Sequence, residues 1–454
     1  MFASFLMFIG VCILLTIIKK DLGLWLMLLI GLLADPVRKV TPNSPFYISA
    51  IFVVILLIVY LQYMTSKSRR ESIFQYIPNL KTSFKLFCLF FIINAIRPLF
   101  VSISFIPLVL MGSAQYIGLF AATLLGFNLV KDEKSIIRFA DVFVITLVPF
   151  LFSVVLEYWG FKSQFFGVMS IGKWVQYHTG GEGLSMFCGV FRFPEGMGWF
   201  AMVAAVSSLY LIIRKKNNLL NLFYVSSFAL SGFCILLSGR RKFYIGVFAF
   251  ILVFIIVAFR KNLNKAVMYL LLFAAACGIF YHYVGRSEKI ELYIKSGESG
   301  FSSTKERLSS GVIGSVYWAI RRDGFFGRGL GTTTQGSRHI KVETGVRGYI
   351  EAGPGKVISD LGVPGFIAFI MILLAYLKGV YKRVLKGRLK DAREVTGVFL
   401  LAMVLTQIAE FSISHQIFGD PLVAVLTGLM AGFLLAVPRF MSVDSNVEPV
   451  KTGG

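Results

Sequence analysis

Apolar residues form long blocks along the chain, and polar residues are concentrated in the gaps between these blocks. A block of about 17–21 apolar residues is long enough for a helix to cross a hydrocarbon core about 30 Å thick. Backbone groups in lipid must find hydrogen bonds within their own segment, so the blocks predict transmembrane helices. The expected spans are 2–18, 22–34, 46–63, 84–98, 113–130, 137–157, 197–213, 219–238, 242–259, 264–283, 358–377, 394–413 and 418–438.

Two places leave the number of spans open. The block 22–34 is short, and the stretch 99–112 could be a re-entrant segment or a further span. The predicted fold class is an all-α polytopic membrane protein with about 12–14 transmembrane helices and a large outer loop domain between late helices.

Composition agrees with this pattern, because 56% of the 454 residues are hydrophobic and only 15% are charged. A soluble domain carries about 25% charged residues. A soluble enzyme, a disordered protein and a secreted disulfide scaffold are therefore excluded. The five cysteines are scattered without a CxxC motif, which argues against a zinc or redox centre.

The net charge of +23 could indicate a nucleic-acid partner, but many of the basic residues lie in alternate short connectors between apolar blocks. Such a bias marks the cytoplasmic side of a membrane protein, so no nucleic-acid partner is expected. This orientation places the C-terminus in the cytoplasm and the long loops 158–196 and 284–357 on the outer side. The expected parts are an N-terminal bundle (1–283), an outer cap (284–357), C-terminal helices (358–441) and a disordered cytoplasmic tail (442–454).

Several arginines are candidates for binding an anion. Arg240 and Arg241 precede Lys242 in a connector so short that all three must lie at or below the membrane surface. Charge at that depth is usually paired or functional, so we expect a bound phosphate, with snorkelling to lipid headgroups as the alternative. Arg97 and Arg192, each close to one end of a span, are weaker candidates of the same kind.

Two loop segments have an expected structural role. The glycine-rich stretch 324–334 lacks the strand-to-helix context of a nucleotide site, so we expect a tight turn that packs the cap onto the helices. The segment 35–42, with prolines at both ends of its core, is expected to be a turn on the outer side.

Few residues could act as an acid or base. Glu351 lies near Lys356 at the membrane boundary, where it could be a general base or form a salt bridge between cap and helix. His339 lies in the same outer loop. The sequence contains no HExxH motif and no carboxylate-rich cluster, so no metal and no cofactor are expected.

Three short motifs together resemble the superfamily of O-antigen ligases and O-antigen polymerases. They are the Ser238–Arg241 junction, the stretch Trp318–Thr332 and the stretch Glu351–Gly365, and the resemblance covers mainly residues 190–370. The resemblance implies a glycosyltransferase of the GT-C type in the bacterial inner membrane. It would transfer glycan from undecaprenyl pyrophosphate on the periplasmic side, with no nucleotide sugar and no obligatory metal.

The resemblance also implies roles for individual residues. Arg241 matches the arginine expected to hold the pyrophosphate, and Arg192 and Arg307 resemble other arginines that line that site. Ligases place His-Asn where this chain has Glu351-Ala352, so a polymerase of O-antigen or exopolysaccharide fits better than a lipid A-core ligase. Glu351 or His339 would then deprotonate the acceptor hydroxyl.

The implied partners are a lipid-linked oligosaccharide, membrane lipids and other polysaccharide export or assembly proteins. Two further functions stay open. One is a transporter or flippase of an anionic lipid-linked glycan, although the sequence lacks the inverted halves typical of transporters. The other is a non-catalytic scaffold of an envelope complex, which would need no cavity lined by arginines.

Overall fold

A computed structural model gives the fold. It describes residues 2–42, 48, 51–65, 73–170, 173–174, 178–179, 184–214, 217–258, 264, 267–268, 271, 312–333, 352–385, 393–414 and 416–442.

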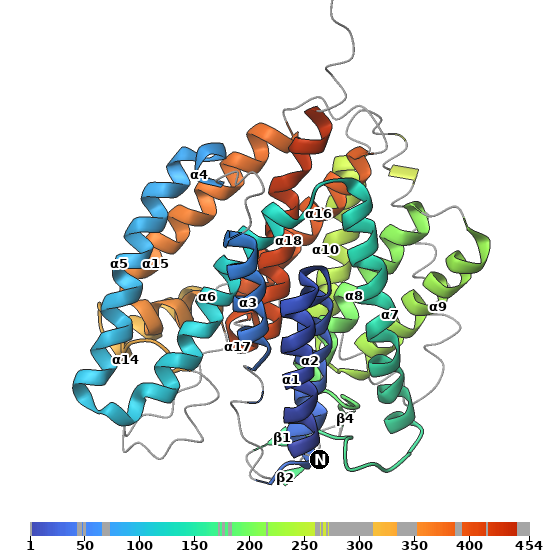
Figure 1. Ribbon diagram of the computed structural model, residues 1–454, viewed down its shortest axis with the longest axis horizontal. Coiled ribbons are helices and arrows are strands. Elements are labelled where there is room, and N and C mark those ends of the chain that lie inside the picture. The colour runs from blue at the N-terminus through green and yellow to red at the C-terminus, as the bar shows by residue number, and fades with distance from the viewer. Residues whose placement is uncertain are drawn as a thin grey trace, which may run out of the picture.

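Helices make up most of this part of the chain (Figure 1). They are α1 (Phe2–Ile18), α2 (Lys20–Val40), α3 (Ile51–Thr65), α4 (Ile73–Tyr76), α5 (Pro78–Val101), α6 (Ile106–Leu129), α7 (Glu133–Tyr158), α8 (Pro194–Arg214), α9 (Asn218–Leu237), α10 (Arg241–Ala258), α14 (Gly314–Asp323), α15 (Gly353–Val380), α16 (Arg393–Ile413), α17 (Gln416–Gly419) and α18 (Pro421–Ser442). A 3-10 turn, η2 (Ile103–Phe105), joins α5 to α6, and a π-helical turn, η5 (Tyr381–Leu385), follows α15.

Four two-residue strands form two small antiparallel hairpins within the first long loop. They are β1 (Met169–Ser170) with β2 (Lys173–Trp174), and β3 (His178–Thr179) with β4 (Leu184–Ser185).

Eight helices of the described part are long and apolar enough to cross a membrane. Three shorter apolar helices, at Ser4–Ile18, Ile51–Tyr63 and Lys242–Ala258, accompany them. Many large apolar side chains on the outside of the bundle are exposed, as Phe100 (86%) and Leu219 (77%) illustrate, and such a surface is stable only against lipid. The chain is therefore an all-α polytopic membrane protein. The expected span 264–283 lies largely outside the described residues, so the total of 12–14 stays a prediction.

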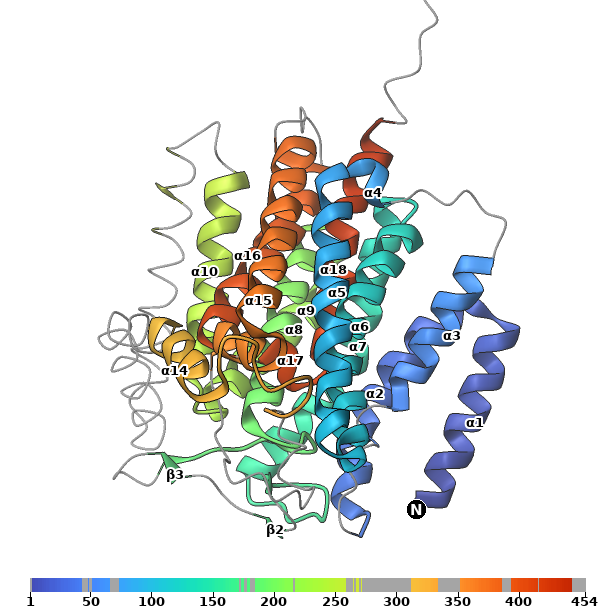
Figure 2. The ribbon, with the colours of Figure 1, turned by 90° about the vertical axis from the view of Figure 1, so that its left-hand side faces the viewer.

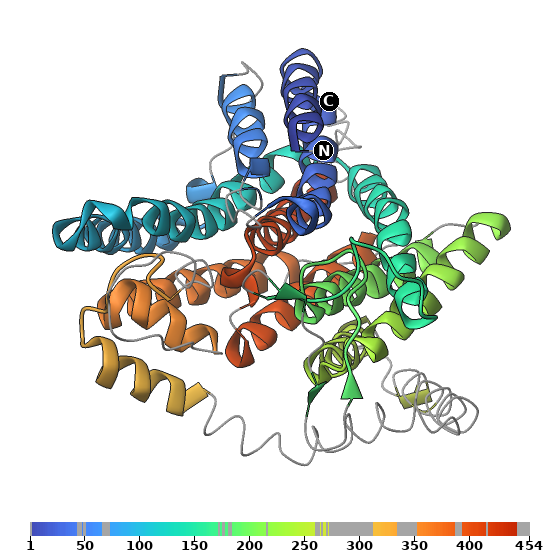
Figure 3. The ribbon, with the colours of Figure 1, turned by 90° about the horizontal axis from the view of Figure 1, so that it is seen from below.

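The helices α6 and α18 pack closely along each other at the centre of the bundle. Seen from the end that carries the hairpins, α18 (red) lies in the middle of the helix array (Figure 3). Glycines make this approach possible: a Cβ on Gly428 would lie 2.2 Å from the Leu119 carbonyl oxygen, and one on Gly432 would lie 2.3 Å from that of Thr123. Small residues allow membrane helices to approach in this way.

Two expectations about connections are wrong. The stretch 99–112 is neither a re-entrant segment nor a further span, because α5 continues to Val101 and α6 begins at Ile106. The segment 35–42 is mostly helical, since α2 runs through Pro36 to Val40. Proline removes one backbone donor and its ring crowds the carbonyl one turn earlier, but a membrane helix can tolerate it when neighbouring elements satisfy the freed groups.

The described parts of both long loops lie at the same end of the bundle. The hairpins β1–β2 and β3–β4 are at the bottom of Figure 1 and of Figure 2, and the helix α14 lies in the lower half of both views; we call this end the loop end. Of the expected cap, the structure describes α14 and the segment 324–333. The helix expected to begin at 358 starts earlier, at Gly353, and it is kinked at Gly362, where φ is +74° and ψ is 174°, so a short buried helical segment precedes the longer one.

Candidate functional site

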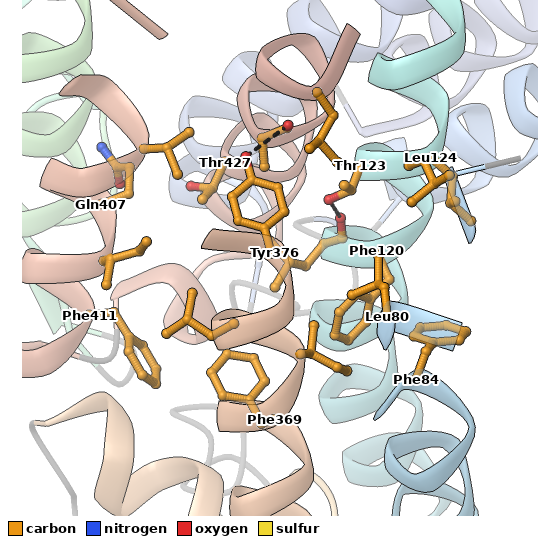
Figure 4. A pocket seen from close by; sticks show the side chains of 18 of the residues that line it. Leu80, Phe84, Phe120, Thr123, Leu124, Phe369, Tyr376, Gln407, Phe411 and Thr427 are labelled. Carbon is orange, nitrogen blue, oxygen red and sulfur yellow. Dashed lines mark hydrogen bonds between the residues drawn. The ribbon is translucent and has the colours of Figure 1, made fainter. Parts of the chain in front are cut away.

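A cavity of about 150 Å³ lies mainly between α5, α6, α15, α16 and α18. All five helices are among those able to cross a membrane. Among the residues that the structure describes, none that lines the cavity is charged, which makes the cavity suited to a hydrocarbon ligand. Figure 4 shows the side chains pointing into it, and those labelled are Leu80, Phe84, Phe120, Thr123, Leu124, Phe369, Tyr376, Gln407, Phe411 and Thr427.

Three phenylalanines line one part of the cavity wall. The ring centroids of Phe369, Phe411 and Phe418 lie 5.6 to 5.8 Å from one another. Tyr116 stacks on Phe418 with a centroid distance of 4.5 Å, and its hydroxyl donates a hydrogen bond of 3.1 Å to Asp360 Oδ2. These rings connect the apolar cavity to a buried group of polar residues.

The helix α16 connects the cavity wall to the beginning of α10. Gln407 lines the cavity, and its Oε1 accepts a hydrogen bond of 2.8 Å from Trp199 Nε1. Ser414, directly after α16, accepts a hydrogen bond of 2.8 Å from Lys242 Nζ at the start of α10. Glu410 lies between them, about one helical turn from each.

Glu410 is buried without a partner. Glu410 is only 5% exposed, and neither of its carboxylate oxygens accepts a hydrogen bond. Lys242 acts on it electrostatically but does not donate a hydrogen bond to it. An ionisable side chain inside a membrane segment is rare and usually functional. Glu410 is therefore the strongest candidate for chemistry in the described part of the chain.

Asp360, on α15, is also buried but fully hydrogen-bonded. Its Oδ2 lies 2.9 Å from Lys356 Nζ, one turn earlier on the same helix, and also accepts the Tyr116 hydroxyl. Its Oδ1 accepts a hydrogen bond of 2.9 Å from Thr333 Oγ1. We call Lys356, Asp360, Tyr116 and Thr333 the Asp360 cluster. Lys356 pairs with Asp360, whereas the sequence suggested Glu351, which lies outside the described residues.

The segment 324–333 packs on the helices through its backbone, so the expected tight turn is confirmed. Arg328 N donates to Ser359 O at 2.8 Å, and Leu330 N donates to Asn94 O at 2.9 Å. Gly331 has φ +80°, and a Cβ there would lie 1.9 Å from the carbonyl oxygen of Leu108. Only glycine fits this combination of conformation and close approach.

Arg97 binds this turn. Its Nη1 donates hydrogen bonds of 2.9 and 2.8 Å to the carbonyl oxygens of Phe326 and Gly327. Asp323, at the end of α14, holds the same turn through Arg328 Nε at 2.9 Å. In the described contacts Arg97 thus joins α5 to the cap.

Arg192 and Arg240 each face an acidic side chain at the loop end. Arg192 Nη2 lies 3.5 Å from Asp420 Oδ2, and its backbone N–H donates to Asp35 Oδ2 at 3.1 Å. Arg240 Nη2 lies 2.5 Å from Glu195 Oε1. Burial raises the pKa of Asp420, while the Arg192 charge acts in the opposite direction.

A further buried network at the loop end was not expected from the sequence. Lys39 Nζ donates to the carbonyl oxygens of Phe165 and Gly189, at 2.9 and 2.8 Å. Glu157 Oε2 accepts from the backbone N–H groups of Cys188 and Gly189, at 3.0 and 2.6 Å. Burial raises the pKa of the Cys188 thiol, so it stays protonated at neutral pH. This network ties the first long loop to α2 and α7.

The structure does not describe the side chains of four expected site residues. Arg307, His339 and Glu351 lie outside the described residues, and so does the side chain of Arg241, although α10 begins at that residue. No contact in the described part joins Arg97 to Arg192 or Arg240.

Neither Glu410 nor the Asp360 cluster was predicted from the sequence. Glu410 is the one acid in the interior of the expected span 394–413, which otherwise has only Glu394 at its first position, and this was the signal for it because charge in an apolar block is costly. Lys356 and Asp360 are four residues apart, a spacing that brings side chains together on a helix.

Within the described residues, no group of three or more histidine, cysteine or acidic side chains could hold a metal ion.

No protein-family description matches the chain, and no curated protein sequence matches it either.

Proposed function

We propose that the chain is a polysaccharide polymerase-like glycosyltransferase of the bacterial inner membrane. Its substrate is a glycan linked to undecaprenyl pyrophosphate, which it elongates at the periplasmic face, and the loop end is that face. The motifs at 238–241, 318–332 and 351–365 motivate this proposal, and it needs neither a nucleotide sugar nor a metal.

One observation carries the proposal: α16 joins an apolar cavity within the membrane bundle to a cationic loop end. Gln407 and Phe411 line the cavity, and Ser414, just past the same helix, binds Lys242 beside Arg241. A lipid-linked glycan has this division, with a long hydrocarbon chain next to a negatively charged diphosphate. The cavity suits the first part and the basic start of α10 suits the second.

The helix α10 begins at the loop end, so the positive end of its dipole adds to the charge of Lys242 at this face. Stabilising the diphosphate as it leaves would be the main catalytic contribution.

The direct experiment mixes the purified protein with undecaprenyl-pyrophosphate-linked oligosaccharide, without nucleotide sugar or added divalent cations. The proposal expects longer glycans on a gel and release of undecaprenyl pyrophosphate. If the oligosaccharide crosses a vesicle membrane but is not elongated, the transporter function replaces this proposal.

Arg241→Ala tests the diphosphate site. Removing one electrostatic group from such a site lowers turnover by about 10²–10³-fold. Arg383→Ala is the matched control, because Arg383 lies after α15 at the opposite end of the bundle and donates to Tyr76 O. Equal activity of the two variants would show that Arg241 is not part of the diphosphate site.

Ala431→Phe tests the cavity, since Ala431 lines it on α18. The added ring occupies space needed by the hydrocarbon chain, so the KM for the lipid-linked substrate should rise. Leu374→Phe is the control. Leu374 is 60% exposed on the outside of α15, so the added ring leaves the cavity unchanged.

A further inference from the structure

Glu410 differs from every other acidic side chain that the structure describes. Asp35, Asp132, Asp141 and Glu157 accept hydrogen bonds from backbone or side-chain donors. The remaining partnered acids are Glu133, Glu195, Asp323, Asp360 and Asp420. Glu410 alone among them has two buried oxygens and no donor. Buried polar groups are almost always paired, so this exception calls for a ligand or a reaction.

The face of α16 that carries Glu410 is turned toward α10. Thr406, Glu410 and Ser414 follow one another at four-residue intervals, which places them on one side of the helix. A Cβ on Gly246 of α10 would lie 3.6 Å from the Thr406 methyl group, and Lys242 of α10 binds Ser414. Glu410 is thus placed between these two contacts, at the level of the second turn of α10.

We propose that Glu410 is the proton acceptor of the transfer reaction. Its carboxylate binds the attacking hydroxyl of the acceptor sugar, with Lys242 as the neighbouring positive charge. This inference rests on the proposed function, and it assigns to Glu410 the role that the sequence suggested for Glu351 or His339.

The acceptor hydroxyl gives its proton to the Glu410 carboxylate, and its oxygen forms a bond to the anomeric carbon of the donor glycan. The bond between that carbon and the diphosphate oxygen breaks, and its electron pair leaves with undecaprenyl pyrophosphate. Glu410 then releases the proton to water before the next turnover.

The first experiment measures elongation of undecaprenyl-pyrophosphate-linked oligosaccharide by Glu410→Gln. The amide keeps the shape of the side chain but cannot take the proton, so kcat should fall by about 100-fold or more with KM little changed. Glu157→Gln is the matched control, because Glu157 is a partly buried loop-end acid whose hydrogen bonds come from backbone N–H groups. It should keep most of the transfer rate.

The second experiment needs no variant. Dicyclohexylcarbodiimide, which reacts with carboxyl groups in apolar surroundings, is applied to the intact protein with and without the lipid-linked oligosaccharide, and the adducts are located by mass spectrometry. Glu410 should be modified, and the oligosaccharide should protect it. Asp360, with both oxygens bonded, should stay unmodified in either case.

The outcomes separate the two proposals. If the wild type elongates glycan and Glu410→Gln does so at half its rate or faster, the assignment of Glu410 is overturned and the proposed function stands. Equal modification of Glu410 with and without oligosaccharide overturns the assignment even if the variant does not fold. If the wild type does not elongate glycan, the proposed function falls and the step at Glu410 falls with it.

Discussion

Asp360 and Glu410 are two buried carboxylates on neighbouring helices, each with a lysine nearby, and their surroundings are opposite. Asp360 receives hydrogen bonds from Lys356, Tyr116 and Thr333. Glu410 receives none, although Lys242 lies close enough to act on its charge. A satisfied carboxylate locks elements together, whereas an unsatisfied one lowers stability and is retained only where it serves a function. The Asp360 cluster holds the cap on the bundle, and Glu410 belongs to the proposed reaction.

The largest expected effect comes from breaking the Asp360 cluster. Asp360→Ala leaves the Lys356 ammonium buried and unpaired, and removing one partner of such a pair destabilises a protein by about 3–5 kcal/mol. The free energy of unfolding in mixed detergent micelles measures this loss. The double variant Lys356→Met/Asp360→Leu should recover a large part of it, because no charge is then left without a partner. A single variant that loses less than about 1 kcal/mol would show that the cluster is not a lock.

A smaller effect is expected at the turn that brings Thr333 to Asp360. Gly331→Ala places a Cβ against the backbone of α6 at a positive φ, so we expect a loss of about 1–3 kcal/mol. The same unfolding measurement detects it. Gly232→Ala on α9, where a Cβ would meet nothing within 4 Å, is the control and should be neutral or stabilising. Equal stability of the two variants would contradict the packing of this turn.

Asp132 is a third kind of carboxylate, a helix cap near the surface. Its Oδ1 accepts from Ser135 N at the start of α7, so Asp132→Ala should cost about 1 kcal/mol. The hydrogen bond from the Ser135 hydroxyl is the main reason why the pKa of Asp132 lies below its ordinary value. The contribution is therefore complete above the ordinary pKa of 3.8 and is lost as the pH falls through the lower folded-state value. A wild-type advantage that persists at pH 2 would contradict this cap.

The smallest expected effect on stability is at Glu410. Glu410→Gln removes no hydrogen bond and relieves the burial of an unpaired carboxylate, so the free energy of unfolding should change by less than about 1 kcal/mol. Asp360→Asn provides the contrast, because it weakens the contact with Lys356. A loss of more than about 2 kcal/mol for Glu410→Gln would mean that Glu410 has a structural partner.

The sequence predicted the membrane helices well, because runs of apolar residues report directly on lipid. The expected span 197–213 matches α8, and 358–377 lies within α15. The predictions at two proline-containing connections were wrong. Pro36 lies inside a helix, and the segment after Pro98 is a short turn between two long helices. Local sequence does not show which neighbours support a helix through a proline.

The candidate site was harder to predict, because its contacts join residues far apart in the chain. Arg97 finds its acceptors 229 and 230 positions later, in a turn whose position no local pattern reveals. The cationic residues were evident from their positions between apolar blocks, but the acids beside Arg192 and Arg240 were not. Glu410 could have been noticed as an acid in the interior of an apolar block, whereas its lack of a hydrogen-bond donor could be seen only in the fold.

The proposed function requires that a lipid-linked glycan occupy the cavity and the loop end together. An electron cryo-microscopy structure in nanodiscs loaded with undecaprenyl-pyrophosphate-linked oligosaccharide would show whether it does. We predict hydrocarbon density between α5, α6, α15, α16 and α18, with a sugar hydroxyl within hydrogen-bond distance of Glu410. A cavity filled by its own phenylalanines, with glycan bound elsewhere and Glu410 still without a partner, would contradict the account.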